Sequence, residues 1–180
     1  MFIIADYLLE CKGENNFFVN TKAAPPACPS CGGRLCYRDC RKRIMRHEGG
    51  GKDWLLIRRF RCKKCHHYHN ELPDCVLPYK HYEAEVISGV LDGIVTADDA
   101  DSENYPSLTT MQRWLQWFIK SMETIKGLLR SAQYRLWGDL GVHCSEKLSL
   151  DGIRTATEKW LEVVMRIIYN SGGYLPAERC

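Results

Sequence analysis

The stretch that decides the fold begins with Cys28-Pro-Ser-Cys31-Gly-Gly and is completed by Cys62-Lys-Lys-Cys65-His. Each half contains a Cys-x-x-Cys pair, and such a turn places two thiolates on one side of a metal ion. Two pairs supply the four ligands of a tetrahedral site, which leaves no open position for a water molecule. The pattern therefore predicts one structural zinc ion, Zn2+, held by Cys28, Cys31, Cys62 and Cys65.

The segment between the two pairs predicts a β-hairpin. Residues 35–45 and 54–60 have strand-like composition, and the glycine-rich residues 47–53 between them predict a turn. The hairpin accounts for the 30 residues that separate Cys31 from Cys62, which exceed the common spacing of roughly 15–20. We therefore expect a zinc ribbon, a β-hairpin with two Cys-x-x-Cys knuckles.

Other cysteines and histidines lie close to these pairs in the sequence. Some could replace a cysteine ligand, because imidazole also suits zinc; these are Cys75, His66, His67 and His69. Cys36 and Cys40 lie four residues apart in the first predicted strand, so we expect both on one face as small buried side chains. A redox pair is disfavoured, because neither Cys-x-x-Cys begins a helix in a βαβ unit.

Positive charge is concentrated in the same module. The chain has a net charge of +3, but residues 34–67 contain 12 Lys and Arg against three acidic residues, which gives +9 there and −6 elsewhere. Such a module favours a polyanionic partner, and dense arginines suit phosphate contacts. The basic residues expected to contact nucleic acid are Arg38, Arg41, Lys42, Arg43, Arg46, Arg58, Arg59, Arg61, Lys63 and Lys64.

Beyond the hairpin the hydrophobic period becomes helical. Helices are predicted over 79–91, from an N-cap at Ser107, and over 153–169. The middle helix has an apolar stripe of Leu108, Met111, Leu115, Phe118, Met122, Ile125 and Leu129. Trp114 and Trp117 are expected in the core. The opposite side carries residue types that can read base edges from a recognition helix, namely Thr109, Thr110, Gln112, Arg113 and Gln116.

These patterns predict an α+β fold, a zinc ribbon followed by an all-α module with helix-turn-helix-like character. The 180 residues are 45% hydrophobic and 26% charged, which is ordinary for a globular protein. Four segments are expected: an N-terminal strand and linker (1–27), the zinc ribbon (28–78), a helical DNA-binding module (79–135) and a C-terminal helical segment (136–180).

Several classes of protein are disfavoured by the sequence. No apolar run reaches the ~18 residues of a membrane span, and the first ten residues have no basic n-region of a signal peptide. We therefore expect a cytoplasmic, nucleoid-associated protein without a membrane partner, whose ten cysteines do not form a disulfide framework. No paired acid and base or activated nucleophile stands out, so we expect no enzymatic activity.

Four motifs resemble those of known protein families. They are Cys-Pro-x-Cys-Gly-Gly, the run 58–65, His69-x-Glu-Leu-Pro73 and the run 106–114. Over about residues 25–120 the chain resembles a bacterial family of standalone proteins of unknown function. It is also similar to the zinc-finger and helix-turn-helix head of several insertion-sequence transposases. The resemblance implies the four zinc ligands and a recognition helix starting near Ser107. Only about 60 residues follow this region, too few for a nuclease domain, so transposase catalysis is not expected.

The expected function is non-catalytic, zinc-dependent binding of duplex DNA in a bacterial mobile element or phage. The protein would act beside a separate transposase or recombinase, or as a transcriptional regulator. The alternative is a zinc-stapled adaptor whose heptad-spaced helix docks on a protein or dimerises. RNA is a less favoured partner, and the sequence indicates neither the recognised site nor the oligomeric state.

Overall fold

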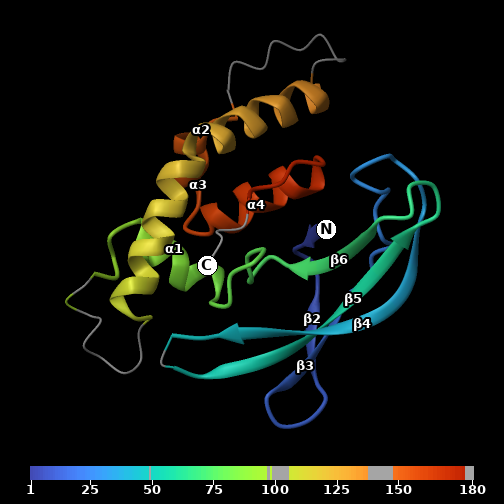
Figure 1. Cartoon of the computed structure of the whole chain (residues 1–180), viewed down its shortest axis with the longest axis horizontal. Helices are drawn as coiled ribbons and strands as arrows, with labels where there is room; N and C mark the ends of the chain where they lie inside the picture. The colour runs from blue at the N-terminus through green and yellow to red at the C-terminus, as the bar shows by residue number, and fades with distance from the viewer. Residues whose placement is uncertain (49, 97, 99–105, 138–147, 177–180) are drawn as a thin grey trace.

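The two predicted strands form a long antiparallel hairpin at the centre of the fold. Strands β4 (Leu35–Arg46) and β5 (Lys52–Cys62) pair along their whole length. The computed structural model describes residues 1–48, 50–96, 98, 106–137 and 148–176. Figure 1 shows the hairpin as a curved ribbon on one side of the molecule, with the helices grouped on the other. The predicted α+β class and the predicted hairpin are confirmed.

Four shorter strands complete a six-stranded sheet. They are β1 (Phe2–Ile4), β2 (Leu8–Cys11), β3 (Asn16–Asn20) and β6 (Tyr68–Pro73), and the strand order is β1-β6-β5-β3-β2 with β4 on the other edge of β5. Strand β3 pairs in parallel with the start of β5, and β6 pairs antiparallel with its end. The sequence predicts a single strand in residues 1–27, and that prediction is wrong, because β2 and β3 follow β1 there. After the second cysteine pair it predicts an extended part closed off at Leu72-Pro73, and β6 ends at Pro73.

The first helix, α1 (Ala84–Leu91), begins five residues later than predicted. Before it, Tyr82 bridges to Arg46 and Glu83 bridges to Val76. These bridges, with a turn at residues 78–79 between them, hold residues 76–83 in a non-helical loop beside the end of β4. Tyr79 has a positive φ of 64°, is 57% exposed and lies outside the helix. The predicted end of the helix is confirmed, since Gly93 follows it with φ 73°.

Helix α2 (Leu108–Trp137) begins where the sequence predicts. The Ser107 carbonyl accepts the backbone N–H of Met111, so Ser107 occupies the N-cap position. Trp114 and Trp117 are buried, as expected. The predicted stripe is partly wrong: Leu108 and Leu115 are 45% and 39% exposed, because the buried side is rotated toward the two tryptophans.

The connection from α1 to α2 spans residues 92–107. A helix-turn-helix motif joins its helices by a three- to four-residue turn. The helix-turn-helix character therefore stays a prediction.

The last predicted helix is two helices, α3 (Leu150–Ala156) and α4 (Trp160–Asn170). Residues 157–159 break the run, and Thr157 is extended at φ −157°. Ser149 caps α3 by accepting the Gly152 N–H at 3.0 Å. Trp160, Val164 and Ile168 of α4 are buried, whereas Ile167 is partly exposed.

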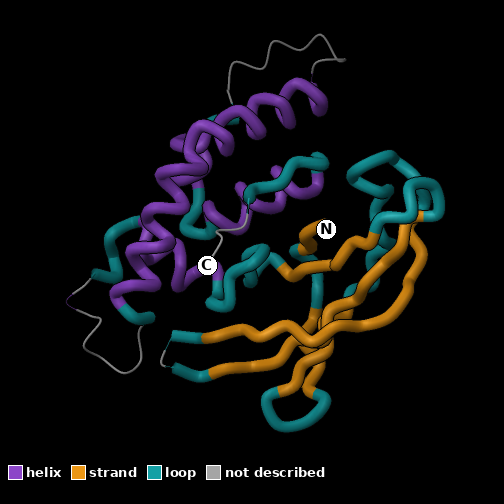
Figure 2. The backbone as a smooth tube through the Cα atoms, viewed as in Figure 1, coloured by secondary structure: helices purple, strands orange, loops and turns teal. Residues whose placement is uncertain are grey.

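The sheet is covered on both faces, but at different ends of the hairpin. Because neighbouring side chains alternate, Leu55 and Ile57 point to one face, here called the helix face, and pack in a main core with α1, α2 and α4. Phe60 and Cys62 point to the other, here called the cysteine face. A second, smaller core there is formed by Phe2, Cys28, Leu35, Phe60 and Cys62. Figure 2 shows the helices packed against only part of the curved sheet.

Helix α4 ties the edge of the sheet to the helices. Strand β1 is the outer strand next to β6, and its free edge would otherwise offer unpaired backbone groups. The Asn170 side chain accepts the Ile3 N–H and donates to the Ile3 carbonyl, both at 2.8 Å. The main core combines residues from all four predicted segments.

Some predictions lie outside the described residues. They include most of the acidic stretch before Pro106, most of the loop predicted from Gly138 to Gly152, Cys144 and Cys180. Among the helices that are described, none is both long and apolar enough to cross a membrane.

A histidine links the hairpin turn to the start of α1. His47 Nε2 lies 2.8 Å from Asp53 Oδ2, and its Nδ1 lies 3.0 Å from Glu83 Oε1. Burial alone would lower the pKa of His47, but the hydrogen bonds and charges of these two carboxylates outweigh burial and raise it. A raised folded-state pKa gives stability that is present below the unfolded pKa of about 6.5 and is lost as pH rises through the folded pKa.

We predict that His47→Gln removes this pH-dependent stability. The free energy of unfolding of the parent protein should exceed that of the variant at low pH by no more than about 1 kcal/mol, since the pair is partly exposed. The difference should shrink above the raised pKa. Urea unfolding across a pH series checks it. His81→Gln is the control, because burial and then the charges of Arg43 and Arg46 lower the pKa of His81. A difference independent of pH contradicts the prediction.

Candidate metal centre

The first cysteine pair lies in a tight turn that leads into β4. The backbone carbonyl of Cys28 accepts the N–H groups of Cys31 at 3.3 Å and of Gly32 at 2.8 Å, while Cys28 N–H donates to Gly33 O at 2.8 Å. Gly32 has φ 70°, in the left-handed region that glycine adopts most easily. The sequence Cys-x-x-Cys-Gly-Gly thus folds both cysteine side chains toward the same point.

The second glycine brings the two cysteine loops into contact. A Cβ atom on Gly33 would lie 2.7 Å from Lys64 Cβ and 2.9 Å from Cys62 Sγ. Such distances are shorter than real Cβ contacts, so no larger residue fits here without displacement of the second loop. Gly33 therefore sets the close approach of the two cysteine pairs.

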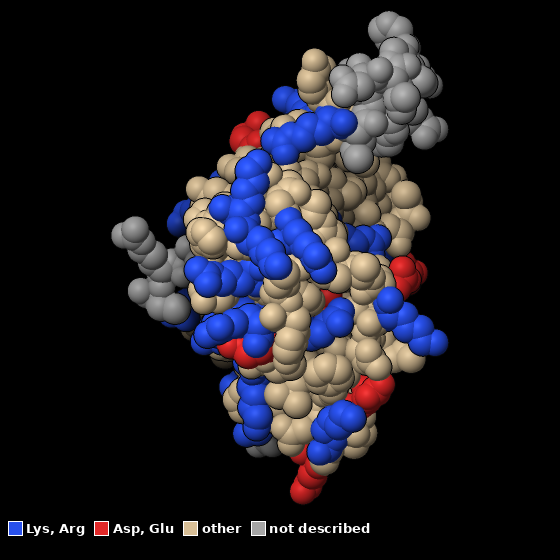
Figure 3. Space-filling view, turned by 90° about the vertical axis from the view of Figure 1, so that its right-hand side faces the viewer, with Lys and Arg blue, Asp and Glu red and all other residues tan. Residues whose placement is uncertain are grey.

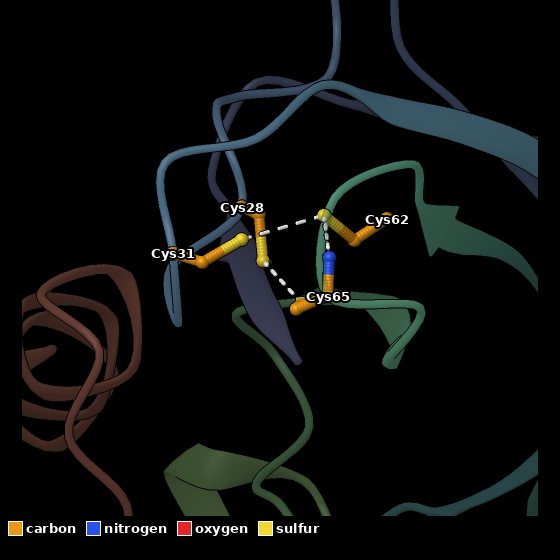
Figure 4. Close-up of side chains that lie close together, drawn as sticks. All are labelled: Cys28, Cys31, Cys62 and Cys65. Carbon is orange, nitrogen blue, oxygen red and sulfur yellow. Dashed lines mark hydrogen bonds between the residues drawn. The ribbon is translucent and has the colours of Figure 1, made fainter.

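The four predicted cysteines converge, as Figure 4 shows. Their sulfur atoms all lie within 4.8 Å of one another, with Cys28 and Cys65 3.7 Å apart and Cys31 and Cys62 3.5 Å apart. Cys28 and Cys62 are buried, and Cys31 and Cys65 are partly buried. Over the described ranges this is the one group of three or more Cys, His, Asp or Glu close enough to share a metal ion.

The electrostatics of the cluster favour a bound cation. The backbone N–H groups of Cys65 and Lys64 point at Cys62 Sγ, and they lower the pKa of Cys62 to about 6. The His67 N–H acts in the same direction on Cys65, but burial and the neighbouring thiols outweigh it and raise the pKa of Cys65 to about 12. Four thiolates this close repel each other, so a positive ion is needed for all four to ionise together.

His69 lies directly behind the cluster. Its Nε2 is 3.3 Å from Cys28 Sγ, its Nδ1 is 3.3 Å from the Met1 nitrogen, and its side chain is 3% exposed. Burial, the Met1 ammonium charge and His67 lower the pKa of His69 to about 4, so the imidazole is neutral. The Met1 nitrogen donates to Nδ1, which leaves the Nε2 proton to donate to the Cys28 sulfur.

Residues predicted as possible substitute ligands are thus separated by the fold. His69 is a hydrogen-bond partner of a cysteine, His66 and His67 are exposed, and Cys75 donates to Met45 Sδ at 3.8 Å instead of joining the cluster. The role of His69 could have been expected from strand alternation after the second pair, which turns Tyr68 and His69 to opposite faces.

The prediction for Cys36 and Cys40 is wrong. A bulge between Tyr37 and Asp39 adds one residue to β4. Cys36 consequently lies beside Arg61 on the helix face, and Cys40 lies beside Arg58 on the cysteine face. Cys36 is partly exposed and Cys40 is exposed, so neither is a buried core residue.

Three of the ten predicted nucleic-acid contacts are engaged inside the protein. Arg58 forms two bonds of 2.6 and 2.8 Å with Glu71, which is 1% exposed. Arg59 forms a two-bond pair with its cross-strand neighbour Asp39. Arg43 donates to the carbonyls of Leu77 and Lys80. The other seven are exposed on the hairpin and second cysteine loop, and they are Arg38, Arg41, Lys42, Arg46, Arg61, Lys63 and Lys64.

The predicted base-reading residues of α2 lie opposite its buried side. Thr109, Gln112, Arg113 and Gln116 are exposed, and Thr110 is partly buried. The start of α2 approaches the turn end of the hairpin, since the Tyr82 ring lies 5.1 Å from Trp114 and 5.7 Å from the Arg46 guanidinium. The cysteine loops lie at the other end of β5. The predicted base-reading residues of α2 therefore lie near the turn end of the hairpin, whereas the exposed cations are spread along the hairpin from Arg46 to Lys64.

Comparison with protein-family models gives a match. Residues 28–114 match the model of a protein family described as a domain of unknown function, DUF6431. No curated protein and no solved structure matches the chain. The matched range begins at the first metal-site cysteine and ends in the first turns of α2, so it contains both cysteine loops, the hairpin and α1.

We predict that Cys62→Ser abolishes metal binding. Cys62 is buried at the contact between the two loops, and loss of one ligand removes the folding energy that the metal supplies. Elemental analysis should show metal in the parent protein and loss from the variant, with increased protease sensitivity of residues 22–70. Cys40→Ser is the matched control, since Cys40 is exposed and outside the cluster. Full metal content in Cys62→Ser would show the ligand assignment to be incorrect.

A second prediction concerns His69. His69→Leu should keep the four ligands but bind metal about tenfold more weakly, because loss of an outer hydrogen bond to a ligand costs about 10–100-fold in affinity. His69→Gln should recover part of the loss, because its amide can donate to Cys28. Competition with a chelator at fixed pH measures both. Equal affinity in the parent protein and His69→Leu contradicts the assigned role.

Proposed function

We propose that the protein holds one structural zinc ion in the cysteine cluster and uses the surrounding basic surface to bind duplex DNA. The cluster supports zinc through its donor set and size. Zinc–sulfur bonds of about 2.3 Å in a tetrahedron give sulfur–sulfur edges of about 3.8 Å, close to the observed 3.5 and 3.7 Å. Four thiolates would complete the coordination shell, so the ion would stabilise the fold and would not activate water.

The observation that carries the DNA proposal is the set of seven exposed basic residues on the hairpin and second loop. None of the seven forms an ion pair with another described residue. Figure 3 shows Lys and Arg side chains gathered over this side of the molecule, with few acidic side chains among them. A zinc–tetrathiolate centre carries a charge of about −2. The positive charge of the seven unpaired residues is therefore larger than the charge needed to neutralise such a centre.

Sequence-specific recognition is proposed for α2. Its exposed Thr109, Gln112, Arg113 and Gln116 include the residue types that recognise adenine, guanine and thymine edges. Action beside a transposase or recombinase, or as a regulator, rests only on the resemblance of the cysteine and arginine motifs. No catalytic role is proposed.

A specific observation favours the adaptor as a second candidate. Leu108, Leu115 and Ile119 are 45%, 39% and 69% exposed, and their spacing places them on one side of α2. An exposed apolar side of this kind suits docking on another protein. Light scattering of the parent protein and of Ile119→Glu separates the candidates. A parent dimer that is lost in the variant, together with DNA affinity of the parent near zero, would favour the adaptor.

We predict that each exposed hairpin cation adds to the salt dependence of DNA binding. For duplex DNA, the slope of log affinity against log salt should decrease by about 0.9 for Arg41→Ala and about 0.9 for Lys42→Ala. Lys12→Ala is the control, because Lys12 lies off this surface and pairs with Glu10. Fluorescence anisotropy at several salt concentrations measures the slopes, and elemental analysis of the same preparation should give one zinc per chain. Absence of duplex binding at low salt would remove the DNA proposal.

A further inference from the structure

One exposed aromatic ring lies close to two arginines at the cysteine end of the sheet. Tyr68, the first residue of β6, is directly opposite Arg61 on β5 and is 51% exposed. The Arg59 and Arg61 guanidinium carbons lie 5.1 and 5.9 Å from the centre of its ring. All three residues are on the helix face, at the end that the helices leave exposed.

Arg59 holds this arrangement in place. Its guanidinium forms a two-bond pair with Asp39, the residue opposite it on β4. The pair neutralises Asp39, and the pKa of that carboxyl is lowered mainly by its hydrogen bond with Arg59. Tyr68 is therefore supported on one side by a fixed planar cation, while Arg61 has no acidic partner among the described residues.

Phosphate-binding groups surround the ring. Lys63 and Lys64 are exposed in the loop that follows Arg61, and Arg34 is exposed where its carbonyl accepts the Lys63 N–H at 3.0 Å. Aromatic rings beside such cations are the pattern by which proteins bind single strands, because every base has a flat face that stacks on an aromatic ring or an arginine. A base that is paired and stacked within a duplex offers no such face.

We propose that Tyr68, together with Arg61, is a stacking site for an unpaired nucleic-acid base, and that the cysteine end of the hairpin binds single-stranded DNA. The proposal rests on the nucleic-acid binding proposed above and identifies the strand state that this end recognises. The phosphates beside the stacked base contact Lys63 and Lys64, and the turn end of the hairpin with α2 is left for duplex DNA.

The experiment uses the zinc-loaded full chain and a labelled thymidine 12-mer, with the same oligonucleotide carrying abasic sites as a second probe. Tyr68→Ala should bind the normal strand about tenfold or more weakly, while Tyr68→Phe should bind it as the parent does. Tyr68→Ala should leave the salt slope unchanged, since no phosphate contact is lost, whereas Arg61→Ala should reduce it by about 0.7. Tyr134→Ala is the control, because Tyr134 is 79% exposed on α2 and so lies outside the strands and loop of the proposed site.

The abasic strand isolates stacking from phosphate contact. The parent should lose about tenfold in affinity on the abasic strand, and Tyr68→Ala should bind both strands equally. Equal single-strand binding by the parent and Tyr68→Ala, with duplex binding retained, overturns this inference and leaves the proposed function standing. No binding of either single-stranded or duplex DNA at low salt overturns both. Unchanged zinc content in Tyr68→Ala excludes misfolding as the cause of a loss.

Discussion

The approach of four cysteine sulfurs to within 4.8 Å is the constraint on which the cysteine end of the molecule depends. Two loops that are far apart in sequence meet there with glycine between them, and Gly33 leaves no room for a Cβ atom beside Cys62. The small core at this end has five buried residues, two of which are Cys28 and Cys62 themselves, too few to order a module by burial alone. A metal ion held by the four sulfurs would supply what this small core lacks, and it would also allow four adjacent thiolates to remain ionised.

The same end is fastened to the helices by contacts that involve no metal. Asn170 at the end of α4 binds the backbone of Ile3, and a Cβ on Gly172 would lie 2.5 Å from the Pro29 carbonyl in the first cysteine loop. Strand β1 runs between these contacts and β6. The segment after α4 therefore lies close to the first cysteine loop, and an ion held by the cysteine cluster would stabilise the helical part as well as the hairpin.

Arginines in the hairpin divide into two groups with different physical roles. Arg58 compensates the buried carboxylate of Glu71, and removal of either partner would leave a buried charge unpaired. Arg43 and Arg59 likewise satisfy carbonyl or carboxylate groups of the fold. The exposed group, which includes Arg38, Arg41 and Arg61, forms no ion pair with another residue that the structure describes. The net positive charge that is counted from the sequence of the hairpin is therefore larger than the positive charge that remains unpaired at its surface.

The sequence by itself determined the features that depend on nearby residues. The cysteine spacing predicted the four members of the cluster, and the glycine-rich turn between apolar runs predicted β4 and β5. An N-cap followed by a helical period predicted the start of α2. Each of these is set by turn chemistry or periodicity within a few residues.

Only the tertiary structure decided what depends on distant pairing. Strands β2, β3 and β6 are four to six residues long and form because β5 or a neighbour offers unpaired hydrogen-bonding groups. A single inserted residue at the β4 bulge placed Cys36 and Cys40 on opposite faces, which no regular alternation predicts. His69 acquired its place beside Cys28, and the arginines acquired their partners, only when β6 paired with β5 and β1 with β6. The physical reason is that hydrogen bonds between strands act over separations in sequence that local patterns do not encode.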